Sequence, residues 1–291
     1  MRSHALEACL GGVWIGDGVE PRIMGAINVS PESFYGRSVA VGDDDLLAAA
    51  ERMVAAGASL IDVGAMSTAP YLRGEISPIE EADRLQRAVG LLARRMGVPV
   101  SADTSRAEPA RAALAAGAEV INDATGLRAD PGLADVVAQA GAGLIVTASP
   151  PRDVSPAGPP LATVSELLAT GVQAATRAGV PAGAIAVDPG IGFFRGQDVA
   201  WPEWDCRILA GLGAVRAIGR PLCVGVSRKS FIGALAGCPD PADRLPGSLA
   251  ATAAAVLAGA HLIRTHDVAE TLQAVRVAWA IRRAGADGVC R

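Results

Sequence analysis

The stretch Ala116-Gly117-Ala118-Glu119-Val120-Ile121-Asn122-Asp123 decides the fold of this chain. It joins the end of a helical segment to a glycine that suits a left-handed helix C-cap, and then to a short apolar strand that stops on two polar residues. This order recurs along the chain, so short β-rich runs alternate with longer segments of helical period. Such alternation is typical of βα units around a parallel sheet.

The alternation extends over the whole sequence. The predicted strands are residues 23–29, 60–64, 98–103, 119–123, 143–148, 184–188, 222–226 and 261–266. The predicted helices are residues 44–56, 78–96, 106–116, 131–140, 163–178, 202–218, 248–258 and 268–283. Eight strands and eight helices in alternation predict an α/β fold of the (β/α)8 TIM-barrel type.

The segments between these elements are regular. Glycines that suit left-handed helix C-caps precede six of the predicted strands, and they are Gly57, Gly97, Gly117, Gly141, Gly179 and Gly259. Residues 10–19 are expected to form a short N-terminal β-hairpin lead-in that closes the bottom of the barrel. No linker, charge block or low-complexity tract divides the chain, so residues 1–291 are expected to form a single domain.

Composition excludes several classes of protein. The net charge is −4 with both signs mixed, which gives no reason to expect nucleic acid or an anionic membrane surface as a partner. No apolar run approaches the roughly 20 residues of a membrane helix. Five scattered cysteines without a Cys-x-x-Cys pair argue against disulfides and a thiolate metal site. Since the first ten residues also show no export-signal pattern, the expected location is the cytoplasm.

Lys229 is the only lysine among the 26 lysine and arginine residues of the chain. It lies in Val224-Gly225-Val226-Ser227-Arg228-Lys229-Ser230-Phe231, at the end of the predicted seventh strand. A lysine that persists in such a composition indicates a position where the planar guanidinium of arginine does not serve. A compact ammonium there is suited to a hydrogen bond with a ring carbonyl or ring nitrogen. The alternative is one surface lysine left by drift.

Polar residues end most of the predicted strands. They are Asn28, Asp103, Thr104, Asn122, Asp123, Thr147, Asp188, Ser227, Lys229, Arg264 and His266. In a TIM barrel the C-terminal ends of the strands carry the active site. Capping of the next helix explains Asp103 or Asp123 equally well when either is considered alone. Capping does not explain the whole set, so a functional rim is expected here.

The polar strand ends fall into groups by charge. Asp103, Asn122 and Asp188 come from three strands and suit a flat ligand with an amidine-like edge, such as a pterin or guanine, because carboxylates accept paired N–H donors. Such a set indicates a heterocycle site.

Arg264, His266 and the amide of Asn28 follow the eighth and first strands, which neighbour each other in a closed barrel. A cation, an imidazole and a neutral donor suit phosphate oxygens. A helix that begins at Ser230 would add free N–H groups for a carboxylate. The three sets together indicate a heterocycle, a leaving phosphate and a second substrate that carries an acid.

Seven motifs occur in a fixed order from about Val13 onward. They are Ile23-Met24-Gly25-Ala26-Ile27-Asn28-Val29-Ser30-Pro31-Glu32-Ser33-Phe34, Ile61-Asp62-Val63-Gly64, Ala102-Asp103-Thr104-Ser105, Ile121-Asn122-Asp123, Asp188-Pro189-Gly190-Ile191-Gly192-Phe193, Gly225-Val226-Ser227-Arg228-Lys229-Ser230 and Ile263-Arg264-Thr265-His266-Asp267. In this order they resemble the dihydropteroate synthases. The resemblance implies a TIM barrel that joins 6-hydroxymethyl-7,8-dihydropterin pyrophosphate to p-aminobenzoate, releasing pyrophosphate and forming 7,8-dihydropteroate for folate synthesis. It also implies Mg²⁺ and a homodimer.

The resemblance assigns roles to individual residues. It implies pterin binding by Asp103, Asn122, Asp188 and Lys229. It implies pyrophosphate binding by Asn28, Thr68, Arg264 and His266, with Asn28 beside the metal. It implies p-aminobenzoate binding by Pro70, Phe193, Lys229 and Ser230. The implied catalytic residues are Lys229, Arg264, His266 and Asp103.

Some positions depart from the family pattern. Met66 and Ala69 stand where the family has an acidic residue and an arginine, so the resemblance is to a divergent branch and leaves the arylamine open. Two alternatives remain. One is a pterin-binding paralogue without synthase activity. The other is a methyltetrahydrofolate-dependent corrinoid methyltransferase, a family that shares the barrel but needs neither the Ser-Arg-Lys-Ser turn nor the Arg-x-His pair.

Overall fold

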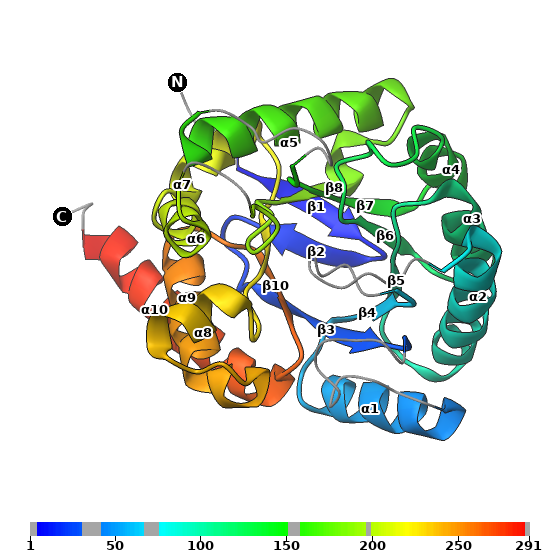
Figure 1. Cartoon of the computed structure of the whole chain (residues 1–291), viewed down its shortest axis with the longest axis horizontal. Coiled ribbons are helices and arrows are strands. Elements are labelled where there is room, and N and C mark those ends of the chain that lie inside the picture. The colour runs from blue at the N-terminus through cyan, green and yellow to red at the C-terminus, as the bar shows by residue number, and fades with distance from the viewer. Residues whose placement is uncertain (1–4, 31–41, 67–75, 151–157, 196–198, 289–291) are drawn as a thin grey trace.

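The computed structural model describes residues 5–30, 42–66, 76–150, 158–195 and 199–288. Eight parallel strands form one sheet in the order β8-β7-β6-β5-β4-β3-β10-β9. A parallel bridge between Val187 and Leu222 joins the two ends of this order. The sheet is therefore a nearly closed barrel surrounded by helices, which confirms the predicted TIM-barrel class (Figure 1).

The barrel strands are short and almost wholly buried. They are β3 (Arg22–Asn28), β4 (Leu60–Gly64), β5 (Val100–Asp103), β6 (Val120–Asp123), β7 (Gly143–Thr147), β8 (Ile185–Asp188), β9 (Cys223–Gly225) and β10 (Leu262–Thr265). Each predicted strand is present, with ends that differ by at most two residues. Apolar runs of this length suit strands that helices cover on one side and barrel side chains fill on the other.

Seven of the eight predicted helical segments are present as single helices, with ends that differ by up to five residues, and a short helix begins at Ser230 as expected. The helices are α1 (Asp43–Ala55), α2 (Pro78–Arg95), α3 (Ala107–Ala115), α4 (Leu133–Ala140), α5 (Pro160–Arg177), α6 (Trp201–Ala210), α7 (Leu212–Val215), α8 (Ser230–Ala236), α9 (Leu245–Leu257) and α10 (Val268–Gly288). The prediction of one continuous helix over 202–218 was wrong. The helix breaks at Gly211, where a Cβ atom would lie 2.2 Å from the Leu161 side chain of α5. Only glycine fits this close contact, and glycine also destabilises a helix.

A two-stranded antiparallel hairpin precedes the barrel. Its strands are β1 (Glu7–Leu10) and β2 (Val13–Gly16), so it begins earlier than the predicted 10–19. The turn lies at Gly11-Gly12, where both φ angles are positive, at 56° and 85°. A two-residue hairpin turn requires this geometry, and it therefore places the first strand before residue 11.

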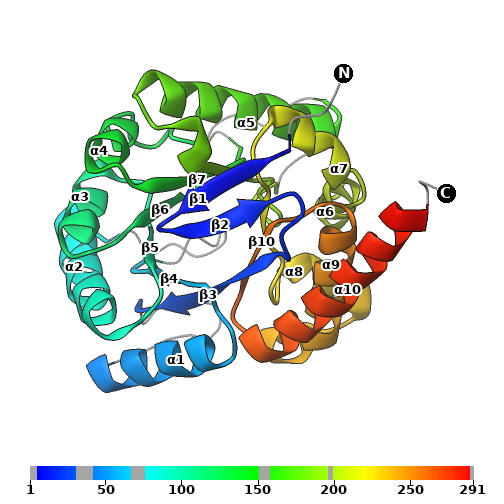
Figure 2. The ribbon, with the colours of Figure 1, turned by 180° about the vertical axis from the view of Figure 1, so that it is seen from behind.

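The hairpin closes the N-terminal end of the barrel. Its buried Ala8, Leu10 and Ile15 belong to one apolar cluster with the first inward residues of the barrel strands, including Met24 and Leu60. Figure 2 shows the hairpin lying across the barrel from behind. At the opposite end of the barrel the strands stop on polar residues.

Five of the six predicted glycine C-caps have positive φ, and they are Gly57, Gly117, Gly141, Gly179 and Gly259. The prediction for Gly97 was wrong. Helix α2 leaves its last turn through Met96, which has extended backbone (φ −90°, ψ 141°). The chain therefore turns toward β5 before Gly97, and no left-handed residue is needed there.

A polar cluster fastens the hairpin to the barrel. Arg216 donates from Nη2 to both carboxylate oxygens of Asp17, at 2.8 and 2.9 Å. His261 accepts from the Leu222 N–H at Nδ1, so its neutral form carries a proton on Nε2, which lies 3.3 Å from Asp17 Oδ1. The pKa of His261 is lowered from 6.5 to about 4, mainly by burial and also by the charge of Arg216, while the hydrogen bond and charge of Asp17 oppose the shift.

The pKa of His261 predicts a pH-dependent contribution to stability. Because the folded-state pKa is depressed, the unfolded chain takes up the proton first as pH falls. The contribution of His261 is fully present above about pH 6.5 and is lost toward pH 4. The difference in unfolding free energy between the wild type and His261→Gln should therefore shrink between pH 7 and pH 5, by on the order of 1–2 kcal/mol.

Urea unfolding of both proteins at both pH values measures this difference. Titration of other groups cancels in the comparison, since both proteins carry them. A difference that stays constant with pH would contradict the neutral-histidine assignment.

Candidate active site

Neighbouring barrel strands bring the predicted rim residues together. Gly64 of β4 pairs with Asp103 of β5, and Asp103 pairs with Asn122 of β6. Asp103, Asn122 and Asp188 are all buried, with less than a tenth of each residue exposed. Polar groups at such depth require partners, so their contacts reveal what the rim is built to hold.

Asp62 is a site residue to which the sequence assigned no role. It lies on β4 inside the barrel and is fully buried. Its Oδ1 accepts from Ser101 Oγ at 2.6 Å, and its Oδ2 accepts from Asn122 Nδ2 at 3.0 Å and from Arg264 Nε at 2.6 Å. The available signal was an acidic residue in the middle of an apolar strand, where helix capping offers no explanation.

Asp62 also determines which way the Asn122 amide faces. Since Nδ2 donates to Asp62, the amide is assigned with Oδ1 turned from that carboxylate. Asn122 therefore offers an acceptor to a ligand, as the carboxylates Asp103 and Asp188 do. Three acceptors on three strands suit an edge that is rich in N–H donors.

Asp103 has one satisfied oxygen and one unsatisfied oxygen. Oδ2 accepts from Arg264 Nη2 at 2.9 Å, while Oδ1 is buried without a hydrogen-bond partner among the described residues. Burial raises the pKa of Asp103 above its ordinary value, against the attraction of Arg264. A buried oxygen without a donor is unfavourable unless a ligand supplies one.

The two candidate capping aspartates behave differently. Asp123 accepts from the backbone N–H groups of Thr125 and Leu127, and so it holds the turn after β6. Asp103 contacts the guanidinium of Arg264 instead. Asp123 therefore holds this turn and does not cap α4, whose N-cap is Gly132, and Asp103 belongs to the rim.

Lys229 lies beside the loop that follows β8. Its Nζ donates to the Ile191 carbonyl and lies 4.8 Å from the centre of the Phe193 ring. Asp188 accepts from the Gly190 N–H at 2.8 Å in the same loop. Burial lowers the pKa of Lys229 and raises that of Asp188, and the attraction between the two side chains opposes both shifts.

The predicted phosphate-binding residues are only partly brought together. The guanidinium of Arg264 bridges Asp62 and Asp103, so it lies with the heterocycle set. His266 follows β10, and its Nδ1 lies 2.9 Å from Ser227 Oγ. The pKa of His266 is lowered from 6.5 to about 3, mainly by burial and also by the charge of Arg264, so the neutral imidazole is favoured.

The remaining predicted site residues lie at the ends of barrel elements or outside the described residues. Asn28 ends β3, and its Oδ1 accepts from the Ser30 N–H at 2.8 Å. Ser230 begins α8, and its hydroxyl accepts from Arg195. Thr68 and Pro70 lie outside the described residues. The roles assigned to all of these residues stay predictions.

Known proteins that resemble this chain in sequence identify its family. The pterin binding enzyme family matches residues 24–266. The dihydropteroate synthase of Mycobacterium leprae is 37% identical over 277 residues, which cover 91% of this chain and 94% of that protein. The chain belongs to the dihydropteroate synthase family. The sequence resemblance is thereby confirmed.

Solved dihydropteroate synthases share the fold. A Yersinia pestis enzyme with a bound sulfonamide drug complex is 33% identical, with a TM-score of 0.86 over 96% of this chain and 100% of that chain. A Burkholderia cenocepacia enzyme complexed with 7,8-dihydropteroate is 35% identical, with a TM-score of 0.84 over 98% of this chain and 100% of that chain. A dihydropteroate synthase barrel therefore accounts for nearly the whole chain.

The contacts of Asp62 predict a binding defect. Asp62→Asn removes the charged acceptor that holds Arg264 and Asn122, and hydrogen bonds to charged groups contribute about 1.5–3 kcal/mol each. The affinity for a pterin analogue should fall roughly tenfold or more. Calorimetry measures the affinity, and Asp17→Asn is the control because Asp17 also binds an arginine but lies at the other end of the barrel. Unchanged affinity in a folded Asp62→Asn protein would remove Asp62 from the site.

Proposed function

We propose that this chain is a dihydropteroate synthase that condenses 6-hydroxymethyl-7,8-dihydropterin pyrophosphate with p-aminobenzoate to give 7,8-dihydropteroate and pyrophosphate. The observation that carries this proposal is the buried rim of acceptors, with Asp103 Oδ1 left without a donor among the described residues although Arg264 binds the other oxygen. The Burkholderia cenocepacia relative, with the same fold, is complexed with the proposed product. The family match over residues 24–266 includes the C-terminal ends of all eight barrel strands. No contact of the described residues favours the methyltransferase or the inactive paralogue.

The pterin half of the site would work by matching donors with acceptors. Asp103, Asn122 and Asp188 present oxygens to the N–H groups of the pterin ring, while the Lys229 ammonium donates to a ring acceptor. Binding of this kind would satisfy the free Asp103 oxygen. The two carboxylates would also favour positive charge that develops on the pterin methylene as the leaving group departs.

The leaving-group half of the site would be formed by Arg264, His266, Asn28 and Thr68. Negative charge grows on the pyrophosphate as the carbon–oxygen bond breaks, so a fixed cation lowers the barrier. Arg264 is held at the rim by two carboxylates, and this placement would keep its guanidinium near the reacting end of a bound pterin. The neutral imidazole of His266 is suited to donate a hydrogen bond without adding a second full charge.

Mg²⁺ fits the donor set as an ion carried with the substrate. The described ranges, with their gaps at residues 31–41 and 67–75, contain no group of three or more His, Cys, Asp or Glu that could hold a metal ion. Mg²⁺ commonly takes one or two protein oxygens and completes its shell with phosphates and water. Asn28 Oδ1 accepts one hydrogen bond and has a second lone pair for this role. A bound ion would neutralise charge on the pyrophosphate.

The second substrate would lie against Phe193, Pro70, Lys229 and Ser230. The Phe193 ring provides an aromatic face next to the Lys229 ammonium. Ser230 and the guanidinium of Arg195, which donates to it, would meet the carboxylate of the arylamine. An arylamine is already a free nucleophile at neutral pH, so the site needs no strong general base.

The proposal includes a homodimer in the cytoplasm, built from one domain per chain. An apolar groove of about 410 Å³ lies between α9 and α10, and Leu257, Val277 and Ile281 around it are 46%, 62% and 58% exposed. A contiguous apolar face of this kind favours pairing with a second copy about a two-fold axis. Within the described part of the chain, no helix combines the length and apolar character needed to cross a membrane.

Incubation of the purified protein with dihydropterin pyrophosphate, Mg²⁺ and p-aminobenzoate tests the activity. We expect 7,8-dihydropteroate and pyrophosphate in equal amounts, because one carbon–oxygen bond breaks for each carbon–nitrogen bond that forms. Omission of the arylamine is the control. Pterin binding without product, with p-aminobenzoate or related arylamines, would favour the inactive paralogue.

The contacts of Lys229 predict that arginine cannot replace it. Its side chain passes over Gly192, where a Cβ atom would lie 2.8 Å from Lys229 Cδ, and its compact ammonium donates to the Ile191 carbonyl, a contact that the planar fork of arginine does not reproduce. Lys229→Arg should lose turnover by roughly a hundredfold, with little change in Tm. Steady-state kinetics beside a thermal melt measure both quantities. Near-normal turnover would show that Lys229 contributes positive charge alone.

A further inference from the structure

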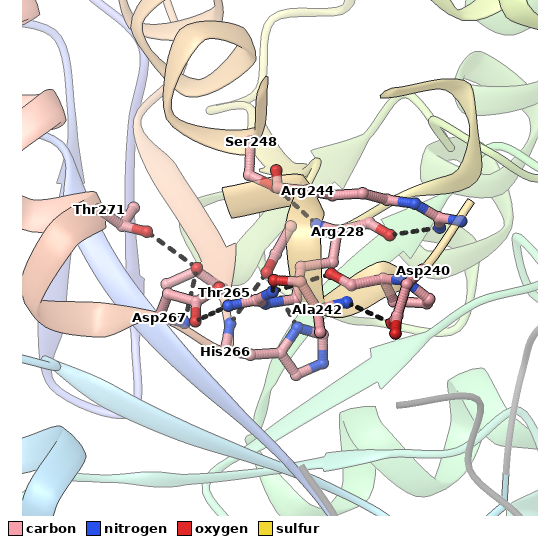
Figure 3. A network of polar contacts seen from close by, with 11 residues as sticks. Arg228, Asp240, Ala242, Arg244, Ser248, Thr265, His266, Asp267 and Thr271 are labelled. Carbon is pink, nitrogen blue, oxygen red and sulfur yellow. Dashed lines mark hydrogen bonds and ion pairs between the residues drawn. The ribbon is translucent and has the colours of Figure 1, made fainter. Parts of the chain in front are cut away.

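Arg228 lies between two predicted site residues and forms the centre of a buried network (Figure 3). Its Nε donates to Asp267 Oδ2 at 2.8 Å and its Nη2 to Asp267 Oδ1 at 2.7 Å. Its Nη1 donates to the carbonyls of Pro241 and Ala242, at 2.8 and 2.7 Å, in the 3-10 helix η4 (Pro241–Arg244). A two-point ion pair with only 6% of the arginine side chain exposed is a strong geometric constraint.

The backbone of Arg228 is held in a strained conformation. Its φ is 55°, and Leu127 is the other non-glycine residue with positive φ in the described ranges. Its N–H donates to Ser248 Oγ at 2.8 Å, and its carbonyl accepts from Arg244 Nη1 at 3.1 Å. A conformation of this kind costs on the order of 1–3 kcal/mol and persists only where surrounding contacts determine it.

The strained turn decides where its neighbours point. Because Arg228 extends to Asp267, Lys229 leaves the turn toward the loop after β8, where it meets the Ile191 carbonyl. Ser227 on the other side hydrogen-bonds to His266, both through Nδ1 at 2.9 Å and through the backbone N–H at 3.3 Å. The ion pair therefore joins the loop that carries Lys229 to the loop that carries His266.

We propose that Arg228 and Asp267 are positioning residues that set Lys229 relative to His266 and Arg264 for the transfer reaction. This inference rests on the proposed function. It also accounts for two adjacent basic residues of different kinds. A planar fork is needed at position 228 to bind Asp267 and two carbonyls at once, and a compact ammonium is needed at position 229.

Matched arginine-to-lysine substitutions test the proposal. Arg228→Lys keeps the charge but loses the two-point contact, and kcat/KM should fall roughly tenfold to hundredfold at a temperature where the protein is fully folded, as expected for a site displaced by about 1 Å. Arg216→Lys is the control, because Arg216 makes a similar two-point pair with Asp17 at the closed end of the barrel. The control should lose stability and keep wild-type kcat/KM. Equal loss of activity in both variants would overturn the proposal.

A double-mutant cycle separates positioning from general destabilisation. If Arg228 acts through Lys229, the fold loss caused by Lys229→Ala should be smaller in the Arg228→Lys background than in the wild type. Asp267→Asn should behave like Arg228→Lys, because it weakens the same pair while retaining a side chain that can cap α10. If the fold losses in kcat/KM of the two single variants simply multiply in the double variant, the two residues act independently and the proposal is overturned.

The same cycle can be measured as calorimetric affinity for a pterin analogue. This second measurement does not depend on turnover. A wild-type protein that forms no dihydropteroate would contradict the proposed function, while non-additive affinities would still support the positioning role. Additive affinities in an active enzyme would contradict the positioning role alone.

Discussion

The buried carboxylate of Asp62 is the constraint on which the rim depends. Donors from three other strands reach it, namely Ser101, Asn122 and Arg264. An isolated carboxylate at this depth would cost several kcal/mol in lost hydration, so these donors act as a set. Asp62 thereby decides that Asn122 offers an acceptor and that Arg264 stays above the barrel core. Its position in the middle of a strand, below the rim, makes it a support for the residues that would meet the ligand.

Opposed charges in a dry barrel give the site its chemical character. Burial raises the pKa of Asp103 and Asp188 and lowers that of Lys229, while each side chain has an oppositely charged neighbour that limits the shift. The unsatisfied oxygen of Asp103 marks where this arrangement is incomplete without a ligand. A ligand rich in N–H donors would complete the arrangement by donating a hydrogen bond to that oxygen.

The local pattern of the chain predicted most of the fold. Strand positions were right to within two residues because short apolar runs with polar ends leave few alternatives. The errors have two origins. The break in the predicted helix depends on a tertiary contact, because Leu161 packs against Gly211. The position of the hairpin depends on the Gly11-Gly12 turn, a local signal that the sequence itself carries. Polar strand ends likewise predicted a rim, since parallel strands of a barrel end on one side.

By itself, the sequence determined the barrel class, the list of polar strand ends and the family, because periodicity, glycine placement and motif order are properties of neighbouring residues. The tertiary structure alone decided which partners those residues meet. Arg264 and Asp62 are 202 residues apart, and Arg228 and Asp267 are 39 apart. Contacts at such separations depend on how the strands close around the core. The directions of side chains at the rim are therefore set by packing and charge pairing across the barrel, and no local pattern encodes them.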